Sequence, residues 1–212
     1  MEPTAQTPDE IRQALATDGQ LALAGYFESF RARLAKIVSF RLDHRLGGRV
    51  STSDVLQEAY VRAAKRLDHF LSNDNMPLFV WLRMEVQQQL VDLHRMHLAA
   101  EKRDVRKERV RLGFADASGT SRAMAWELSA QITSPSQWLR RAERLAWLET
   151  TLNEMNELDR EVIALRHFEE LSNDEAAQVL QISSAAASKR YLRALKRLRE
   201  ISQATSLGDS VQ

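Results

Sequence analysis

The chain has 212 residues, a formal net charge of +1 and no cysteine. This length allows one or two domains, and the absence of cysteine excludes disulfides and thiolate metal or redox sites. The balanced charge excludes attraction to polyanions through bulk charge, so any such contact must depend on local clusters. With only 7 glycines and 4 prolines, and with Leu, Ala, Arg and Glu abundant, the composition favours a mostly helical protein.

Residues 1–18 are mostly polar and carry several acids. They lack the basic start and apolar core of a signal peptide, and no apolar run along the chain is long enough to span a membrane. We therefore expect a cytoplasmic protein without membrane association, whose residues 1–18 form a flexible N-terminus.

The first helical domain is predicted over residues 19–112. Apolar residues recur at helical spacing from Leu21 to Val38, which predicts a helix that begins near Gly19. After the LGGR break, hydroxyl side chains at 51–53 can cap a second helix over about 54–71. Turn-forming residues over 72–77 predict a loop, and Pro77 suits the first turn of a third helix.

Small and polar residues predict a linker over 113–136, with at most a weak helical patch near Trp126. A second helical domain is expected over 137–204, with helices over 138–156, 159–168 and 173–180 and a basic helix from Ser184. Residues 205–212 are predicted to be a flexible C-terminus. The expected fold is all-α, with two small helical domains joined by a flexible linker and no strands.

The segment 171–195 has the layout of a helix-turn-helix. Ser172 and Glu175 form a capping-box pattern at the first helix, and Ser183 or Ser184 can cap the second. Ile182 is expected to pack between the two helices. The buried stripe predicted for the second helix consists of Ala187, Tyr191, Ala194, Leu195 and Leu198.

Positive charge is concentrated on the other faces of this second helix, with one acid, Glu200, in the segment 182–200. Lysine and arginine contacts to phosphate supply salt-dependent affinity, and contacts to base edges supply sequence preference. A solvated amphipathic helix is the plainer alternative. The scarcity of acids and the preceding helix-turn-helix pattern favour DNA binding.

An enzyme is not expected. The histidines show no metal-binding spacing, and the chain has neither a phosphate-binding glycine loop nor a nucleophile elbow. No metal and no cofactor is predicted.

Two blocks of sequence resemble a known family. DVLQE, at residues 54–58, and the aromatic-bearing segment 79–95 resemble region two of bacterial sigma factors, and LDREVIALRHFEELSNDEAAQVLQIS with the following basic helix resembles region four. With only these two regions, the chain is similar to the extracytoplasmic-function group. The resemblance covers roughly residues 23–201, apart from the linker.

The resemblance implies a transcription initiation factor whose partners are core RNA polymerase, through the β′ clamp and the β flap, and promoter DNA, with an anti-sigma factor as a further partner. The expected clamp-docking residues are Asp54, Gln57, Glu58 and Arg62. The residues expected at the −10 element are Ser72, Asn73, Asp74, Asn75, Trp81, Gln88, His94 and Arg95. Those expected at the −35 element are Ser184, Ala185, Ser188, Lys189, Arg190, Arg193 and Arg197.

Several alternatives stay open at this point. Trp81 can either stack on a base or belong to the core, Phe79 follows core spacing, and Gln88 stands where the family often has Asn. The docking residues also fit an ordinary solvated face. A stand-alone dimeric helix-turn-helix regulator and an adaptor that binds no DNA are the rival functions, and no role is assigned to Trp126 or Trp138.

Overall fold

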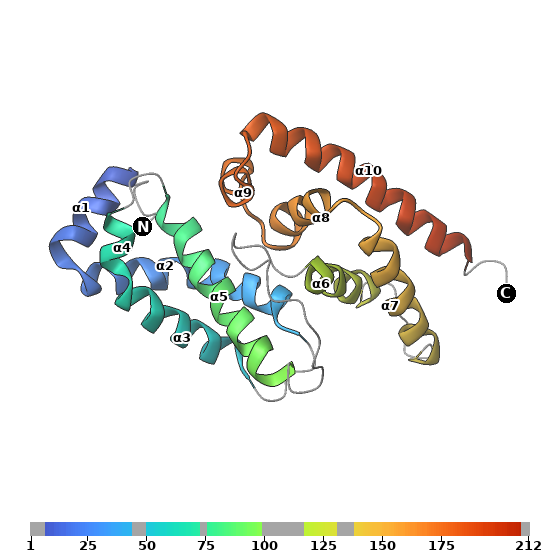
Figure 1. Cartoon of the computed structure of the whole chain (residues 1–212), viewed down its shortest axis with the longest axis horizontal. Helices are drawn as coiled ribbons and strands as arrows, with labels where there is room; N and C mark the ends of the chain where they lie inside the picture. Colours follow the sequence, from blue (N-terminus) through green and yellow to red (C-terminus); the bar gives the residue numbers. More distant parts are fainter. Residues whose placement is uncertain (1–6, 44–49, 73–75, 99–116, 131–137, 209–212) are drawn as a thin grey trace. The chain divides into compact units, whose positions relative to one another are not determined.

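The computed structural model describes residues 7–43, 50–72, 76–98, 117–130 and 138–208. The chain divides into two compact units, Met1–Arg106 and Lys107–Gln212 (Figure 1). No strand occurs in these described ranges, so the prediction of an all-α fold with two helical domains is confirmed. Within the same ranges, no helix combines the length and the apolar character needed to cross a membrane.

The first unit is built around three long helices, α2, α3 and α5, which pack against one another (Figure 1). Their shared core includes Leu34, Ala59, Leu82 and Val86, all fully buried. The predicted helix over 54–71 is divided at Arg66, whose φ of −114° and ψ of 11° lie outside the helical region. The helices of this unit are α1 (Pro8–Asp18), α2 (Gln20–Arg41), α3 (Thr52–Lys65), α4 (Leu67–Leu71) and α5 (Leu78–Leu98).

Helix α1 differs from the flexible N-terminus that the sequence predicts over residues 1–18. The Thr7 hydroxyl accepts the Glu10 N–H at 3.3 Å, and the Glu10 carboxylate accepts the Thr7 N–H at 2.8 Å, a complete capping box. Pro8 stands in the first turn, where its missing N–H costs nothing. Leu15 is buried, so tertiary packing adds to these local signals.

The second unit contains several shorter helices and ends with the long helix α10, which is the second helix of the helix-turn-helix (Figure 1). Helix α6 lies inside the predicted linker and packs on α7 and α8, with Met124 and Ala125 buried. The last helix, α10, runs to Gly208 and so extends into residues 205–212, which the sequence predicts to be a flexible C-terminus. The elements are α6 (Ala117–Ala130), α7 (Trp138–Asn153), α8 (Glu157–Ile163), the π-helical turn η3 (Ala164–Phe168), α9 (Asn173–Leu180) and α10 (Ser184–Gly208).

Two buried charges hold this unit together. The Glu161 carboxylate accepts the Thr120 hydroxyl at 2.9 Å, which ties α8 to α6. The Arg160 guanidinium donates to the carbonyls of Leu152 at 2.7 Å and Met155 at 3.3 Å. It thereby links the start of α8 to the end of α7 and to the turn that follows it.

Candidate nucleic-acid and polymerase interfaces

The helix-turn-helix is capped as its sequence predicts. The Ser172 hydroxyl accepts the Glu175 N–H at 3.2 Å and the Glu175 carboxylate accepts the Ser172 N–H at 2.8 Å. At the turn, Gln181 adopts a left-handed conformation, with φ 54° and ψ 42°, which ends α9. The Ser183 hydroxyl accepts the Ala186 N–H at 3.2 Å and caps α10.

The start of α10 is tied directly to the start of α9. The Ser184 hydroxyl donates to Asp174 Oδ1 at 2.5 Å, and Asn173 Nδ2 donates to the Ser184 carbonyl at 2.9 Å. These bonds set the direction in which α10 leaves the turn. The hydroxyl of Ser184 is thereby engaged by Asp174, although Ser184 is exposed, as are Ala185 and Ser188.

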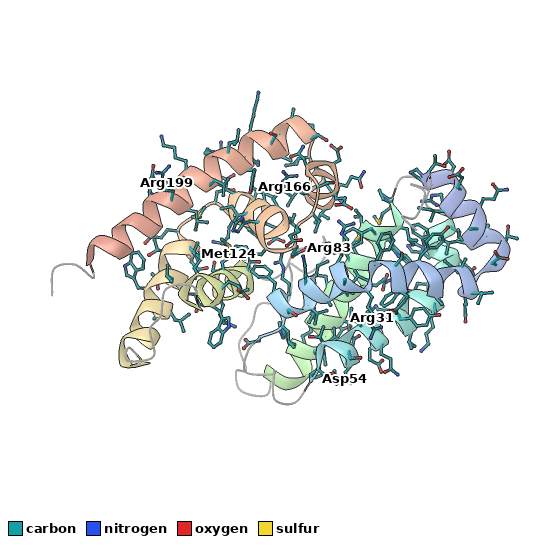
Figure 2. All side chains as sticks on the ribbon, turned by 180° about the vertical axis from the view of Figure 1, so that it is seen from behind. Arg31, Asp54, Arg83, Met124, Arg166 and Arg199 are labelled. Carbon is teal, nitrogen blue, oxygen red and sulfur yellow. The ribbon has the colours of Figure 1, made fainter. Side chains whose placement is uncertain are left out.

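Helix α10 is amphipathic in the predicted sense. Ala187, Ala194 and Leu198 are buried, and Tyr191 and Leu195 are half-buried. The Arg166 guanidinium of η3 lies 5.2 Å from the centroid of the Tyr191 ring, a cation–π contact that joins the two elements. Basic side chains occupy the solvent face of the helix, including the exposed Lys189, Lys196 and Arg199. Arg199 is labelled in Figure 2.

Two arginines of this helix share one carboxylate. Asp159 Oδ1 accepts hydrogen bonds from Arg190 Nη1 and Arg193 Nη2, both at 2.8 Å, and Oδ2 accepts from Arg193 Nε at 3.1 Å. Burial alone would raise the pKa of Asp159, but the hydrogen bonds and charges of Arg193 and Arg190 outweigh it and lower that pKa. The sequence gives no indication of this pairing, because Asp159 lies on a different helix, α8, from the two arginines on α10.

Arg197, the last residue predicted for −35 contact, pairs with Glu200 one turn further along α10, at 3.2 Å. Both side chains are exposed, so this ion pair contributes little to stability.

In the first unit, Asp54 is part of the cap of α3 as well as a surface carboxylate. It accepts the Ser51 hydroxyl at 2.6 Å and the Ser51 N–H at 3.0 Å. These two bonds, the hydroxyl first, lower the pKa of Asp54. Asp54, Gln57 and Glu58 are all exposed on α3, with Asp54 at its start (Figure 2).

Arg62, the fourth predicted docking residue, is placed differently. Its guanidinium forms ion pairs with Glu85 at 3.0 Å and with Asp92 at 2.8 Å, both on α5. Arg66 pairs with the same Glu85 at 3.1 Å. Gln88 joins this group by donating to Asp92 at 3.1 Å. The structure therefore brings Arg62 and Gln88 together in a polar network between α3 and α5.

The residues predicted for the −10 element fall into separate places. Trp81 is only 4% exposed and stacks on Phe70 with the ring centroids 4.6 Å apart, so it belongs to the core. Phe79 is also core, as its spacing predicts. The Ser72 hydroxyl donates to the His69 carbonyl.

His94 Nε2 accepts the Asp43 N–H at 3.3 Å, which fixes the ring against the end of α2. Arg95, the next residue of α5, is exposed. The predicted contacts Asn73, Asp74 and Asn75 lie outside the described residues, as does Trp138 beyond its backbone.

Arg12 is a residue of this region that sequence reasoning missed. From α1 it donates to the carbonyls of Phe70 at 3.3 Å and Met76 at 3.1 Å, and its guanidinium lies 4.6 Å from the centroid of the Phe70 ring. It therefore joins the end of α4 to the segment that leads into α5. The capping-box pattern TPDE at residues 7–10 was the available signal that a helix carries it.

No three His, Asp or Glu side chains gather as a metal site anywhere in the described ranges. The groups that these ranges do bring together are the Asp159 pairing in the second unit and the Glu85 network in the first.

Comparison with known proteins is consistent with the helix-turn-helix in the second unit. Residues 145–198, which include the whole helix-turn-helix, match the sequence profile of the family described as Sigma-70, region 4. No curated protein matches the sequence of the chain.

The chain is also similar to a solved structure, described as CnrH in complex with the cytosolic domain of CnrY. The identity is 23% and the TM-score is 0.51, and the alignment covers 93% of this chain and 97% of CnrH. This similarity concerns the fold, and it extends over both helical units. The profile match supports the resemblance of residues 145–198 to region four, and the solved structure supports the two-unit fold.

Proposed function

We propose that this protein is a transcription initiation factor that binds core RNA polymerase and directs it to promoters. The second unit reads the −35 element and the first unit reads the −10 element. The observation that carries this proposal is the coincidence of the Sigma-70 region 4 match with a capped helix-turn-helix whose second helix has a basic solvent face. The protein performs no chemistry of its own in this role, because the polymerase catalyses RNA synthesis.

At the −35 element, the start of α10 enters the major groove. The small exposed residues Ala185 and Ser188 leave room for close approach. Lys189 and Arg193 follow within one turn and a half and contact phosphates or guanine edges. Because such phosphate contacts release counterions, the affinity falls with rising salt.

At the polymerase, the docking surface on α3 consists of Asp54, Gln57 and Glu58, which are exposed on one side of the helix. Arg62 supports this surface from the Glu85 network rather than contacting the clamp. The −10 element is contacted by Ser72, the adjoining residues 73–75 and the exposed Arg95. Gln88 and His94 hold the neighbouring surface of α5 in place.

A protein partner that inhibits this factor is part of the proposal. CnrH, which has the same fold, forms a complex with the cytosolic domain of CnrY. We infer that an anti-sigma partner binds this chain in the same general way and that the factor acts in the cytoplasm, where the polymerase is found.

Run-off transcription tests the proposal directly. Bacterial core polymerase is supplied with a pool of randomised promoters, with and without this protein. Protein-dependent transcripts with two enriched elements would support the proposed function. No transcripts, combined with tight binding of the protein alone to a palindromic duplex, would instead support a dimeric regulator.

A further inference from the structure

We propose that Asp159 is a positioning residue for the face of α10 that reads the −35 element. It holds Arg190 and Arg193 in one arrangement and so sets the balance between sequence-specific and non-specific DNA binding. This inference rests on the proposed function of the second unit. It concerns a residue of α8 that lies outside the helix-turn-helix pair itself.

The geometry fixes the plane of one guanidinium. Arg193 uses Nε and Nη2 on the two oxygens of Asp159, at 3.1 and 2.8 Å. Such a two-point pair restrains an arginine far more than a single contact does. The N–H groups of Nη1 stay outside this pair, and 64% of the Arg193 side chain is exposed, so its other edge faces solvent. Arginine held this way presents donors to DNA without first losing rotamer freedom.

The two arginines differ in how far their side chains can still present hydrogen-bond donors to DNA. Arg190 also donates to Asp159, at 2.8 Å, but only 29% of its side chain is exposed. Arg190 therefore acts chiefly as the second support for the carboxylate. Arg193 is the side chain that the arrangement presents.

The net charge of Asp159 together with its two arginines matters as much as their geometry. One carboxylate between two guanidinium groups leaves a net charge of one positive unit. Non-specific affinity for DNA rises with the number of cationic groups that replace counterions on the phosphates. Asp159 thus reduces the sequence-independent attraction of α10 while keeping the orientation on which base reading depends.

A purely structural role would be a bridge that holds α8 on α10, and the two roles predict different results. A structural bridge changes the stability of the unit and leaves the choice between DNA sequences as it was. A positioning residue changes the ratio of affinities for specific and scrambled sites, even in protein that is fully folded.

The test measures holoenzyme binding to two duplexes that share the selected −10 element, one with the selected −35 element and one with a scrambled −35 element. Anisotropy titrations are made over a series of salt concentrations with wild type, Asp159→Asn and Asp159→Glu. Glu149→Gln is the matched control, because it also removes a carboxylate paired with an arginine, Arg122, at 3.5 Å in the same unit.

For Asp159→Asn we expect the ratio of the two affinities to fall about five- to tenfold, with non-specific binding strengthened. The slope of log affinity against log salt should become steeper by about one. Asp159→Glu keeps the charge and should recover the wild-type slope and part of the ratio. Glu149→Gln should match the wild type in both quantities.

An unchanged ratio and slope in folded Asp159→Asn protein, with only a lower melting temperature, would overturn the inference. If this variant does not fold, Arg190→Gln is compared in the same way with Arg190→Gln/Asp159→Asn. In the double variant, the lost positive charge of Arg190 offsets the lost negative charge of Asp159. A wild-type holoenzyme that does not distinguish the two duplexes would overturn the proposed function, and the inference with it.

Discussion

Arg62 offers the sharpest test of how the first unit is held together, because sequence and structure assign it different roles. The resemblance predicts that it docks on polymerase, whereas the structure pairs it with Glu85 and Asp92 at 3.0 and 2.8 Å. The Glu85 side chain is only 4% exposed, so its charge depends on nearby arginines for compensation.

We expect Arg62→Ala to destabilise the first unit by about 1–3 kcal/mol. Removing one partner of a fully buried pair costs about 3–5 kcal/mol. The loss here is smaller, because Arg66 remains 3.1 Å from Glu85 and Arg62 is itself about one-third exposed.

Urea unfolding followed by circular dichroism measures this loss, and pull-down with core polymerase measures docking. Lys65→Ala is the matched control, since Lys65 is an exposed cation on the same helix. The folded Arg62→Ala protein should still bind polymerase. Wild-type stability together with lost polymerase binding would refute the structural assignment and restore Arg62 to the docking surface.

Four further results follow from the contacts described above. Lys189→Ala should weaken −35 duplex binding by roughly tenfold or less and lower the salt slope by about one, because it removes one phosphate contact; anisotropy over a salt series measures both. Ser172→Ala should cost about 1 kcal/mol in urea unfolding, since it leaves the Glu175 N–H without its cap. The pKa of Asp159 lies below its ordinary value of 3.8 in the folded protein, so the stability it contributes is present above that value and is lost as the pH falls through the folded pKa. Urea midpoints of wild type and Asp159→Asn should therefore converge in acid, and a constant difference would contradict the pairing. Arg12→Ala should lower the thermal stability of the first unit by removing the link from α1 to α4, and proteolysis near residue 72 should quicken; an unchanged cleavage rate would count against this role for Arg12.

Short-range contacts explain why much of the fold could be predicted from the sequence. The caps at Ser51 and Ser172 each join residues three positions apart, so their partners are visible in the sequence itself. The buried stripe of α10 follows from helical periodicity in the same way. The two motif blocks then indicated the resemblance to sigma factors, because they combine local pattern with order along the chain.

The tertiary structure decided what depends on distant partners. Helix α6 has little local signal, and it forms where Met124 is buried and Thr120 reaches Glu161, 41 residues away. Trp81 could have faced a base, and its burial against Phe70 was settled by packing.

The same distinction applies to the basic residues of the candidate site. The sequence by itself determined that α10 carries arginines on a helical face, because that depends only on spacing. Only the tertiary structure could show that Arg193 is held by Asp159, 34 residues earlier, and that Arg62 is held by Glu85. A charged side chain reaches whichever opposite charge the fold brings near it, and that proximity is a property of the packed helices rather than of either segment alone.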